Sequence, residues 1–168
     1  NRAIRSLGHD VDDEIDIAVP AMESRRTREV DARFKDEILA VCTDLAKATH
    51  DALTDGVVPL IIGGDHSLAM GSVAGVAAFH GQNDEDIGLI WVDAHADMNL
   101  PGASPSGNIH GMPLAHLLGY GDDDMNNILG CRPAVKAENT VLIGVRDIDA
   151  REREIVRESG IKVFTMRD

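Results

Sequence analysis

Two aspartates and a histidine occupy alternate positions in the segment WVDAHADMN, at Asp93, His95 and Asp97. Five of the six residues before Asp93 are apolar, which is typical of a buried strand. If the backbone stays extended beyond this strand, a period of two places all three side chains on one face. Neighbouring carboxylates repel each other, and a divalent cation would remove that repulsion. The spacing therefore predicts a metal site at the end of the strand.

A second polar motif, GGDHS, follows another apolar run and supplies His66 as a further nitrogen ligand. Mixed carboxylate and imidazole ligands suit manganese, iron or zinc better than calcium. Structural zinc is disfavoured because Cys42 and Cys131 lie far from these motifs. Asp65 is interpreted as a turn residue that supports the site. The alternative is a loop with a hydrogen-bonded histidine and no metal, but two such motifs after neighbouring strands favour the metal.

The elements that must position these side chains alternate between strand-like and helix-like patterns. This alternation predicts an α/β fold with a mainly parallel sheet, whose ligand-binding edge lies at the carboxyl ends of the strands. The segments GGDHS, DAHAD and RDID each follow a strand, so they are expected at that edge. The predicted strands are 57–62, 87–92, 140–145 and 161–166, and the predicted helices are 30–52, 68–80, a short helix around Pro113, and 151–159.

Two of the predicted helices have distinct apolar patterns. In the first, apolar residues recur at steps of three and four and predict one buried face. In the second, 68–80, glycines and alanines predict close packing against the sheet. The predicted buried face of the first helix consists of Val30, Phe34, Ile38, Val41, Leu45, Ala48 and Ala52.

Composition limits the possible partners and the compartment. The 168 residues and 43% hydrophobic content predict one globular domain with a sizeable core. A net charge of −13 argues against nucleic acid or an anionic membrane as a partner. The sequence contains no apolar run of transmembrane length, no secretory signal and no C-x-x-C motif. The expected location is therefore the cytoplasm.

Taken together, GGDHS, DAHADMN and SGNIHGMPLA resemble motifs of the arginases, which are members of the ureohydrolase superfamily. The segment IGVRDIDARE (143–152) is also similar to the arginase pattern. This resemblance implies a three-layer α/β/α fold around a parallel sheet. It also implies two manganese ions, hydrolysis of L-arginine to L-ornithine and urea, and possible assembly into trimers or hexamers.

The resemblance further implies the roles of individual metal ligands and of a catalytic histidine. His66 and Asp97 would bind one manganese ion, His95 the other, and Asp93 would bridge the two. His110, in the segment NIHG, matches the histidine that shuttles a proton. The alternative for His110 is a loop histidine without a catalytic role.

Further positions match residues that hold the amino-acid end of the substrate. Asn99 and Ser106 would bind the α-carboxylate, and Asp149 would receive the α-amino group with Glu152 beside it. Asp149 and Glu152 also form a D-x-x-E capping pattern at the start of the helix 151–159, and both roles are compatible. Agmatine lacks the carboxylate, so the loop SGNIHG favours arginase over agmatinase.

The resemblance is incomplete at the C-terminal end. The family completes its site with a later D-x-D segment, and this sequence stops at Asp168. Residues 1–168 are therefore expected to form a single, incomplete arginase-like domain that is inactive in isolation. The alternatives are an agmatinase, a formimidoylglutamase, or a metal-binding protein without catalysis.

Overall fold

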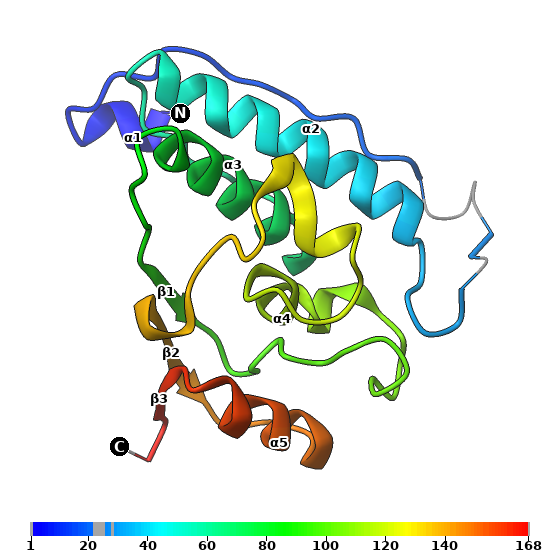
Figure 1. Ribbon diagram of the computed structural model, residues 1–168. Coiled ribbons are helices and arrows are strands. Elements are labelled where there is room, and N and C mark those ends of the chain that lie inside the picture. The colour runs from blue at the N-terminus through cyan, green and yellow to red at the C-terminus, as the bar shows by residue number, and fades with distance from the viewer. Residues whose placement is uncertain (1, 22–25, 28, 168) are drawn as a thin grey trace.

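The computed structural model describes residues 2–21, 26–27 and 29–167 (Figure 1). Helices and parallel strands alternate after the N-terminal third, so the predicted α/β class with a mainly parallel sheet is confirmed. No helix among the described residues is long and apolar enough to cross a membrane. The elements are α1 (Arg2–Ser6), α2 (Lys35–Thr54), α3 (Ala69–Gly81), β1 (Leu89–Val92), α4 (Pro113–Leu117), β2 (Thr140–Val145), α5 (Ala150–Ser159) and β3 (Lys162–Thr165), with 3₁₀ helices at His66–Leu68, Ile109–Gly111, Met125–Gly130 and Ala137–Asn139.

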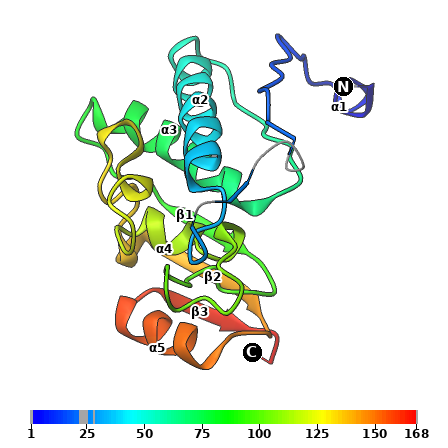
Figure 2. The same ribbon diagram turned by 90° about the vertical axis from the view of Figure 1, so that its right-hand side faces the viewer.

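The sheet contains three parallel strands in the order β1-β2-β3, and α5 makes the crossover from β2 to β3 (Figure 2). Leu89 pairs with Thr140 and Trp91 with Leu142, so equivalent side chains of the two strands share a face. Trp91 and Leu142 are buried in a core that also contains residues of α4 and α5. On the opposite face, Ile90 and Val92 are 70% and 72% exposed.

Helices α2 and α3 lie side by side (Figures 1 and 2). Gly71 and Gly75 of α3 allow this contact, because a Cβ atom at either position would collide with the backbone of Cys42 or Ala46. The glycines of α3 therefore pack against α2 and not against the sheet as predicted, whereas Ala69 of α3 belongs to the same core cluster as Trp91 and Leu142 of the sheet. Two facing helices with small side chains can approach more closely than a helix and a pleated sheet.

The buried face of α2 is shifted from the predicted one. Cys42, Ala46 and Thr49 are buried, whereas Val41, Leu45 and the other predicted helical positions are only half-buried. The helix begins at Lys35, and Val30, predicted to be part of its apolar face, is 74% exposed. The glycines of α3 select the small side chains of α2 for the interface, which is a tertiary effect that the periodicity does not reveal.

The predicted strand 57–62 is wrong. The segment is extended but belongs to no strand, and Val58, Leu60 and Ile62 are 87%, 68% and 85% exposed. The alternation of exposed and half-buried residues along it is that of a strand. An extended segment becomes a strand only when another backbone pairs with it, and none of the described residues does so. The other three predicted strands are confirmed within two residues at each end.

Candidate metal centre

The carboxyl end of β1 and the start of the His66–Leu68 helix meet at one edge of the molecule. Asp93 is the first residue after β1, and its backbone N–H still donates to Ile143 O of β2 at 3.0 Å. Asp65 begins the short helix by accepting a hydrogen bond from Ser67 N at 3.0 Å. Asp65 thus has the turn role that its position suggests, and it fixes the backbone from which His66 projects.

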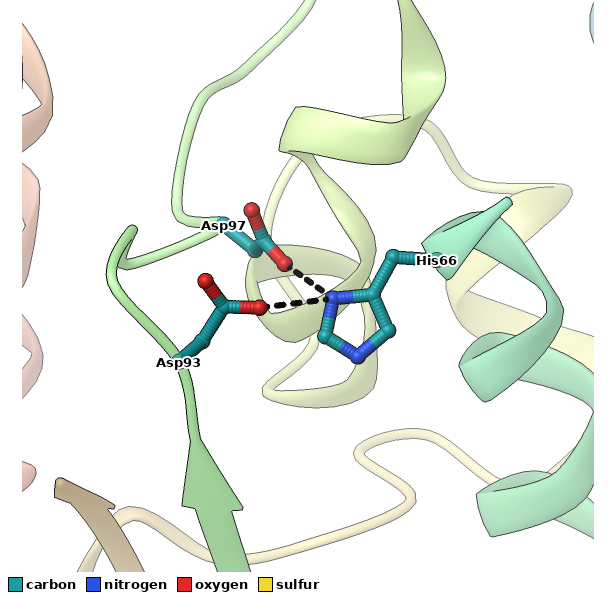
Figure 3. A group of neighbouring side chains, drawn as sticks. All are labelled: His66, Asp93 and Asp97. Carbon is teal, nitrogen blue, oxygen red and sulfur yellow. Dashed lines mark ion pairs between the residues drawn. The ribbon is translucent and has the colours of Figure 1, made fainter. Parts of the chain in front are cut away.

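His66, Asp93 and Asp97 form a compact group in which each residue offers one ligand atom within 4.8 Å of the others. The Nδ1 atom of His66 lies 2.7 Å from Asp97 Oδ2 and 3.2 Å from Asp93 Oδ2, and the two carboxylates approach it from the same side (Figure 3). The contact with Asp97 raises the pKa of His66, and the charge of Asp93 acts in the same direction.

The environment of Asp97 indicates whether the group of His66, Asp93 and Asp97 can bind a cation. The Oδ2 atom of Asp97 is buried and pairs with His66 Nδ1 at 2.7 Å, but among the described residues it has no hydrogen bond of good geometry. A buried carboxylate oxygen without a hydrogen bond is unfavourable unless a positive charge satisfies it. A cation held between His66 and the two carboxylates would satisfy it, so the donor set fits a divalent metal such as manganese.

Trp91 supports the group in a way that the sequence analysis did not identify. Its ring stacks on the His66 imidazole, with centroids 4.4 Å apart and planes inclined by 28°. Trp91 is 4% exposed and points inward from β1. The signal available in the sequence was its position two residues before Asp93, on the same side of the strand.

His95 lies on the other side of Asp93. Its Nδ1 atom is 3.3 Å from Asp93 Oδ1, while Oδ2 of the same carboxylate faces His66. The His95 side chain is 61% exposed, and its Nε2 atom is 3.9 Å from Asp147 Oδ2 in the loop after β2. Asp147 was part of the quoted segment RDID, but only Asp149 was predicted from that segment to be functional.

The predicted shuttle residue, His110, shares a cleft of about 390 Å³ with His66, Asp93, His95 and Asp97. Its Nδ1 atom lies 3.5 Å from Asp65 Oδ2, and its side chain is 54% exposed. The loop that carries it is anchored elsewhere by a hydrogen bond from Arg33 N to Gly107 O of 2.9 Å. The structure therefore brings all five predicted metal and catalytic residues to one cleft.

The predicted substrate residues do not line this cleft. Ser106 and Asp149 are exposed, and Ser106 Oγ accepts a hydrogen bond from Asn108 N at 3.2 Å. Asn99 is 7% exposed, and its buried Oδ1 atom has no hydrogen-bond partner among the described residues.

Glu152 is directed inward and is 4% exposed. Its carboxylate accepts hydrogen bonds from Met98 N at 3.0 Å and from Asp149 N at 3.3 Å. Burial raises the pKa of Glu152, and these two N–H groups oppose the shift. Asp149 and Glu152 form the predicted capping box of α5, and Gly160 ends that helix in a left-handed conformation, as expected.

Comparison with known proteins agrees with these motifs and this fold. The model of the arginase family matches residues 2–168. The chain belongs to the arginase family. Among the curated arginases, that of Brevibacillus brevis is 44% identical over 165 residues, which cover 98% of this chain and 54% of that protein. The chain spans about half the length of the curated relatives it matches.

Solved structures confirm the arginase-like α/β fold. The native arginase of Bacillus caldovelox superposes with a TM-score of 0.91 at 41% identity, covering 99% of this chain and 55% of that one. A formimidoylglutamase of Bacillus subtilis superposes with a TM-score of 0.59 at 21% identity, covering 82% of this chain and 38% of that one. The latter similarity shows the shared fold alone.

Proposed function

We propose that the complete protein is a manganese-dependent arginase that hydrolyses L-arginine to L-ornithine and urea. One observation carries this proposal: the two oxygens of Asp93 face two different imidazoles, His66 at 3.2 Å and His95 at 3.3 Å. A carboxylate between two nitrogen ligands is suited to bridge a pair of cations. Arginase relatives at about 40% identity support the choice of substrate.

The residues divide into two ligand positions around Asp93. His66, Asp97 and one Asp93 oxygen would hold the first ion, and His95 with the other oxygen would begin the second. When bound, a pair of such cations lowers the pKa of a shared water and provides a hydroxide nucleophile near neutral pH. Because these side chains line one cleft, a guanidino group that enters it is held close to both positions.

His110 supplies the proton that the leaving group needs. Hydroxide addition to the guanidino carbon followed by C–N cleavage releases urea and the side-chain amine of ornithine, and this amine leaves only when protonated. The imidazole of His110 opens to the same cleft and is 54% exposed, so it can exchange protons with solvent. Asp65 Oδ2 lies 3.5 Å from the Nδ1 atom of His110, on the ring that faces this cleft.

Asn99, Ser106 and Asp149 are proposed to select the amino-acid end of arginine. The amide N–H groups of Asn99 and the hydroxyl of the exposed Ser106 are the donors that could pair with an α-carboxylate, and the exposed Asp149 carboxylate could accept from the α-amino group. Donors that pair with a carboxylate discriminate against agmatine, which lacks that group and would leave them unpaired. Glu152 lies beside Asp149, but its carboxylate faces the backbone.

Residues 1–168 are proposed to be one incomplete catalytic domain, with the remaining ligands of the second ion in a later D-x-D segment. The length of the relatives supports this. So does the second position, where His95 and one oxygen of Asp93 are the predicted ligands among the described residues. A cytoplasmic location, predicted from the sequence features, and a trimeric or hexameric assembly, implied by the resemblance to arginases, extend the proposal.

The test is a urea assay on the complete protein with manganese, comparing L-arginine and agmatine, together with an assay of formiminoglutamate hydrolysis. The expected result is urea release from arginine well above that from agmatine. Equal or greater release from agmatine would contradict the arginase assignment, and hydrolysis of formiminoglutamate alone would indicate a formimidoylglutamase. Manganese binding without hydrolysis of any of these substrates would indicate a metal-binding protein.

A further inference from the structure

Asp97 has an unusual backbone conformation. Its φ angle is 52°, in the left-handed region, and the residue is only 5% exposed. Such a conformation is less favourable than the right-handed one for a non-glycine residue, although Asp adopts it more often than most residues do. The direction of the Asp97 carboxylate toward His66 follows from this backbone, so the contacts that fix it also aim a metal ligand.

Hydrogen bonds from three directions fix the backbone at 97–99. The carbonyl of Asp97 accepts from the N–H groups of Leu114 and Ala115, at 3.1 and 3.2 Å, in the first turn of α4. The N–H of Asn99 donates to Gly111 O at 3.0 Å. Between them, the buried N–H of Met98 donates to Glu152 Oε1 at 3.0 Å. Among the described residues, Glu152 provides the only side-chain acceptor for this backbone.

Glu152 is itself rigidly held. Its second oxygen accepts from Asp149 N at 3.3 Å within the capping box at the start of α5. The side chain is thus clamped between the first turn of α5 and a loop 54 residues earlier in the chain. Met98 is fully buried, so without Glu152 its N–H would have no water to replace the lost acceptor.

We infer that Glu152 is a positioning residue for the metal ligand Asp97. It fixes the left-handed turn by accepting from Met98 N–H, and this turn aims the Asp97 carboxylate at His66. The hydrogen bond links the ligand-binding edge of β1 to the helix that follows β2. A direct substrate contact by Glu152 would have to reach a side chain that is only 4% exposed and whose two oxygens already accept backbone hydrogen bonds.

The inference is tested by titrating the complete protein with manganese in the absence of substrate. The Mn²⁺ electron paramagnetic resonance signal reports how much metal is bound. Glu152→Ala removes both acceptors, and Glu152→Gln keeps one oxygen that can accept from Met98 N–H. Loss of a residue that orients a ligand typically lowers metal affinity by about 10–100-fold, and this is the loss expected for Glu152→Ala. A smaller loss of about 3–10-fold is expected for Glu152→Gln. The control is Glu154→Gln, the same change at an exposed position of α5.

Turnover separates positioning from substrate binding, and this second measurement rests on the proposed function. If Glu152 acts through Asp97, saturating manganese restores kcat of Glu152→Gln, and KM for arginine stays near that of the control. A raised KM at saturating manganese with unchanged metal affinity would overturn the inference and indicate a substrate contact.

If Glu152→Ala does not fold, the result for Glu152→Gln decides. Metal affinity of Glu152→Gln equal to that of Glu154→Gln would overturn the inference. The titration needs no substrate, so an absence of urea release would contradict the proposed function and leave this test intact.

Discussion

The two ligand positions on either side of Asp93 are built to very different degrees. On one side, His66 and Asp97 approach each other to 2.7 Å, Trp91 stacks on the imidazole, and Asp97 is 5% exposed. On the other side, His95 is 61% exposed, and its further carboxylate neighbour, Asp147, is 83% exposed and 3.9 Å away. The first position is partly enclosed, because Asp97 is buried although the His66 side chain is 41% exposed, and the second lies more open at the edge.

This difference shows how much of the proposed two-metal centre one part of the fold can organise. The first position draws on the His66–Leu68 helix, on β1 and, through the backbone of 97–99, on α4 and α5. The second position has only His95 and the shared Asp93 among the predicted ligands. We therefore expect the first position to bind a metal more tightly, with the second depending on ligands that the described residues do not supply.

Among the variants that test this comparison, Asp97→Asn is expected to have the largest effect on metal affinity. The change keeps the shape of the side chain but removes the charge that completes the first position. Manganese affinity at that position should fall by more than about 100-fold, beyond the loss caused by residues that only orient a ligand. Urea release should disappear with it. Metal titration of the complete protein measures the effect, circular dichroism checks the fold, and unchanged affinity would show that Asp97 is not a ligand.

His95→Ala should affect only the open position. The variant is expected to lose one of two manganese ions and most of its turnover, while the first ion binds about as well as before, because no contact of His66 or Asp97 involves His95. The number of manganese ions bound by each complete protein chain tests this prediction. Asp147→Asn, next to His95, is the matched control and should keep both ions. Loss of both ions in His95→Ala would mean that the two positions are not separable.

His110→Asn should leave both positions occupied and reduce turnover alone. Loss of a positioned proton donor typically slows a reaction by about 10²–10⁴-fold. Metal titration together with the urea assay separates the two properties. A fall in metal affinity would show that His110 has been assigned the wrong role, and an unchanged kcat would exclude it as the proton shuttle.

The smallest expected effect is on the pH dependence of stability, through His116 on α4. Its ring is fully buried, with Nδ1 2.8 Å from Met112 O, and burial lowers its pKa. Asp122 opposes this shift and Lys35 adds to it. Below about pH 6.5 the unfolded chain binds a proton on this residue that the folded chain does not, so stability falls as pH falls.

The slope of this loss has an upper limit of roughly 1.4 kcal/mol per pH unit, the value for a difference of one bound proton between the two states. Because the first turn of α4 holds the backbone of Asp97, acid should weaken the enclosed position first. The slope is measured from the free energy of unfolding in urea between about pH 5 and 8, the range in which histidines titrate. His116→Gln should flatten the slope, whereas His9→Gln, at an exposed position, should not.

Two apolar runs show how far sequence patterns predict this fold. IGLIWV becomes β1 because β2 pairs with it, residue by residue, from Leu89 to Val92. VVPLII has a comparable composition, yet Val58, Leu60 and Ile62 remain exposed. The local pattern of both runs favours an extended backbone, but strand pairing depends on a distant partner that the local pattern cannot identify.

The same distinction applies to the candidate site. The alternate spacing of Asp93, His95 and Asp97 predicts shared orientation, and His66 and His110 do lie in the same cleft with them. The left-handed turn at Asp97 breaks the extended path on which that prediction relied, and the stacking of Trp91 and the inward direction of Glu152 were not predicted. Each of these features depends on contacts between segments far apart in sequence.

Residue types and backbone periodicity are local properties, so the amino-acid sequence was enough to predict which side chains can bind a metal and that they follow strands. Which of these side chains are buried and which are exposed depends on how the chain folds. Burial and orientation arise from distant segments, such as α5 holding Met98 N–H through Glu152, and no local pattern specifies these contacts.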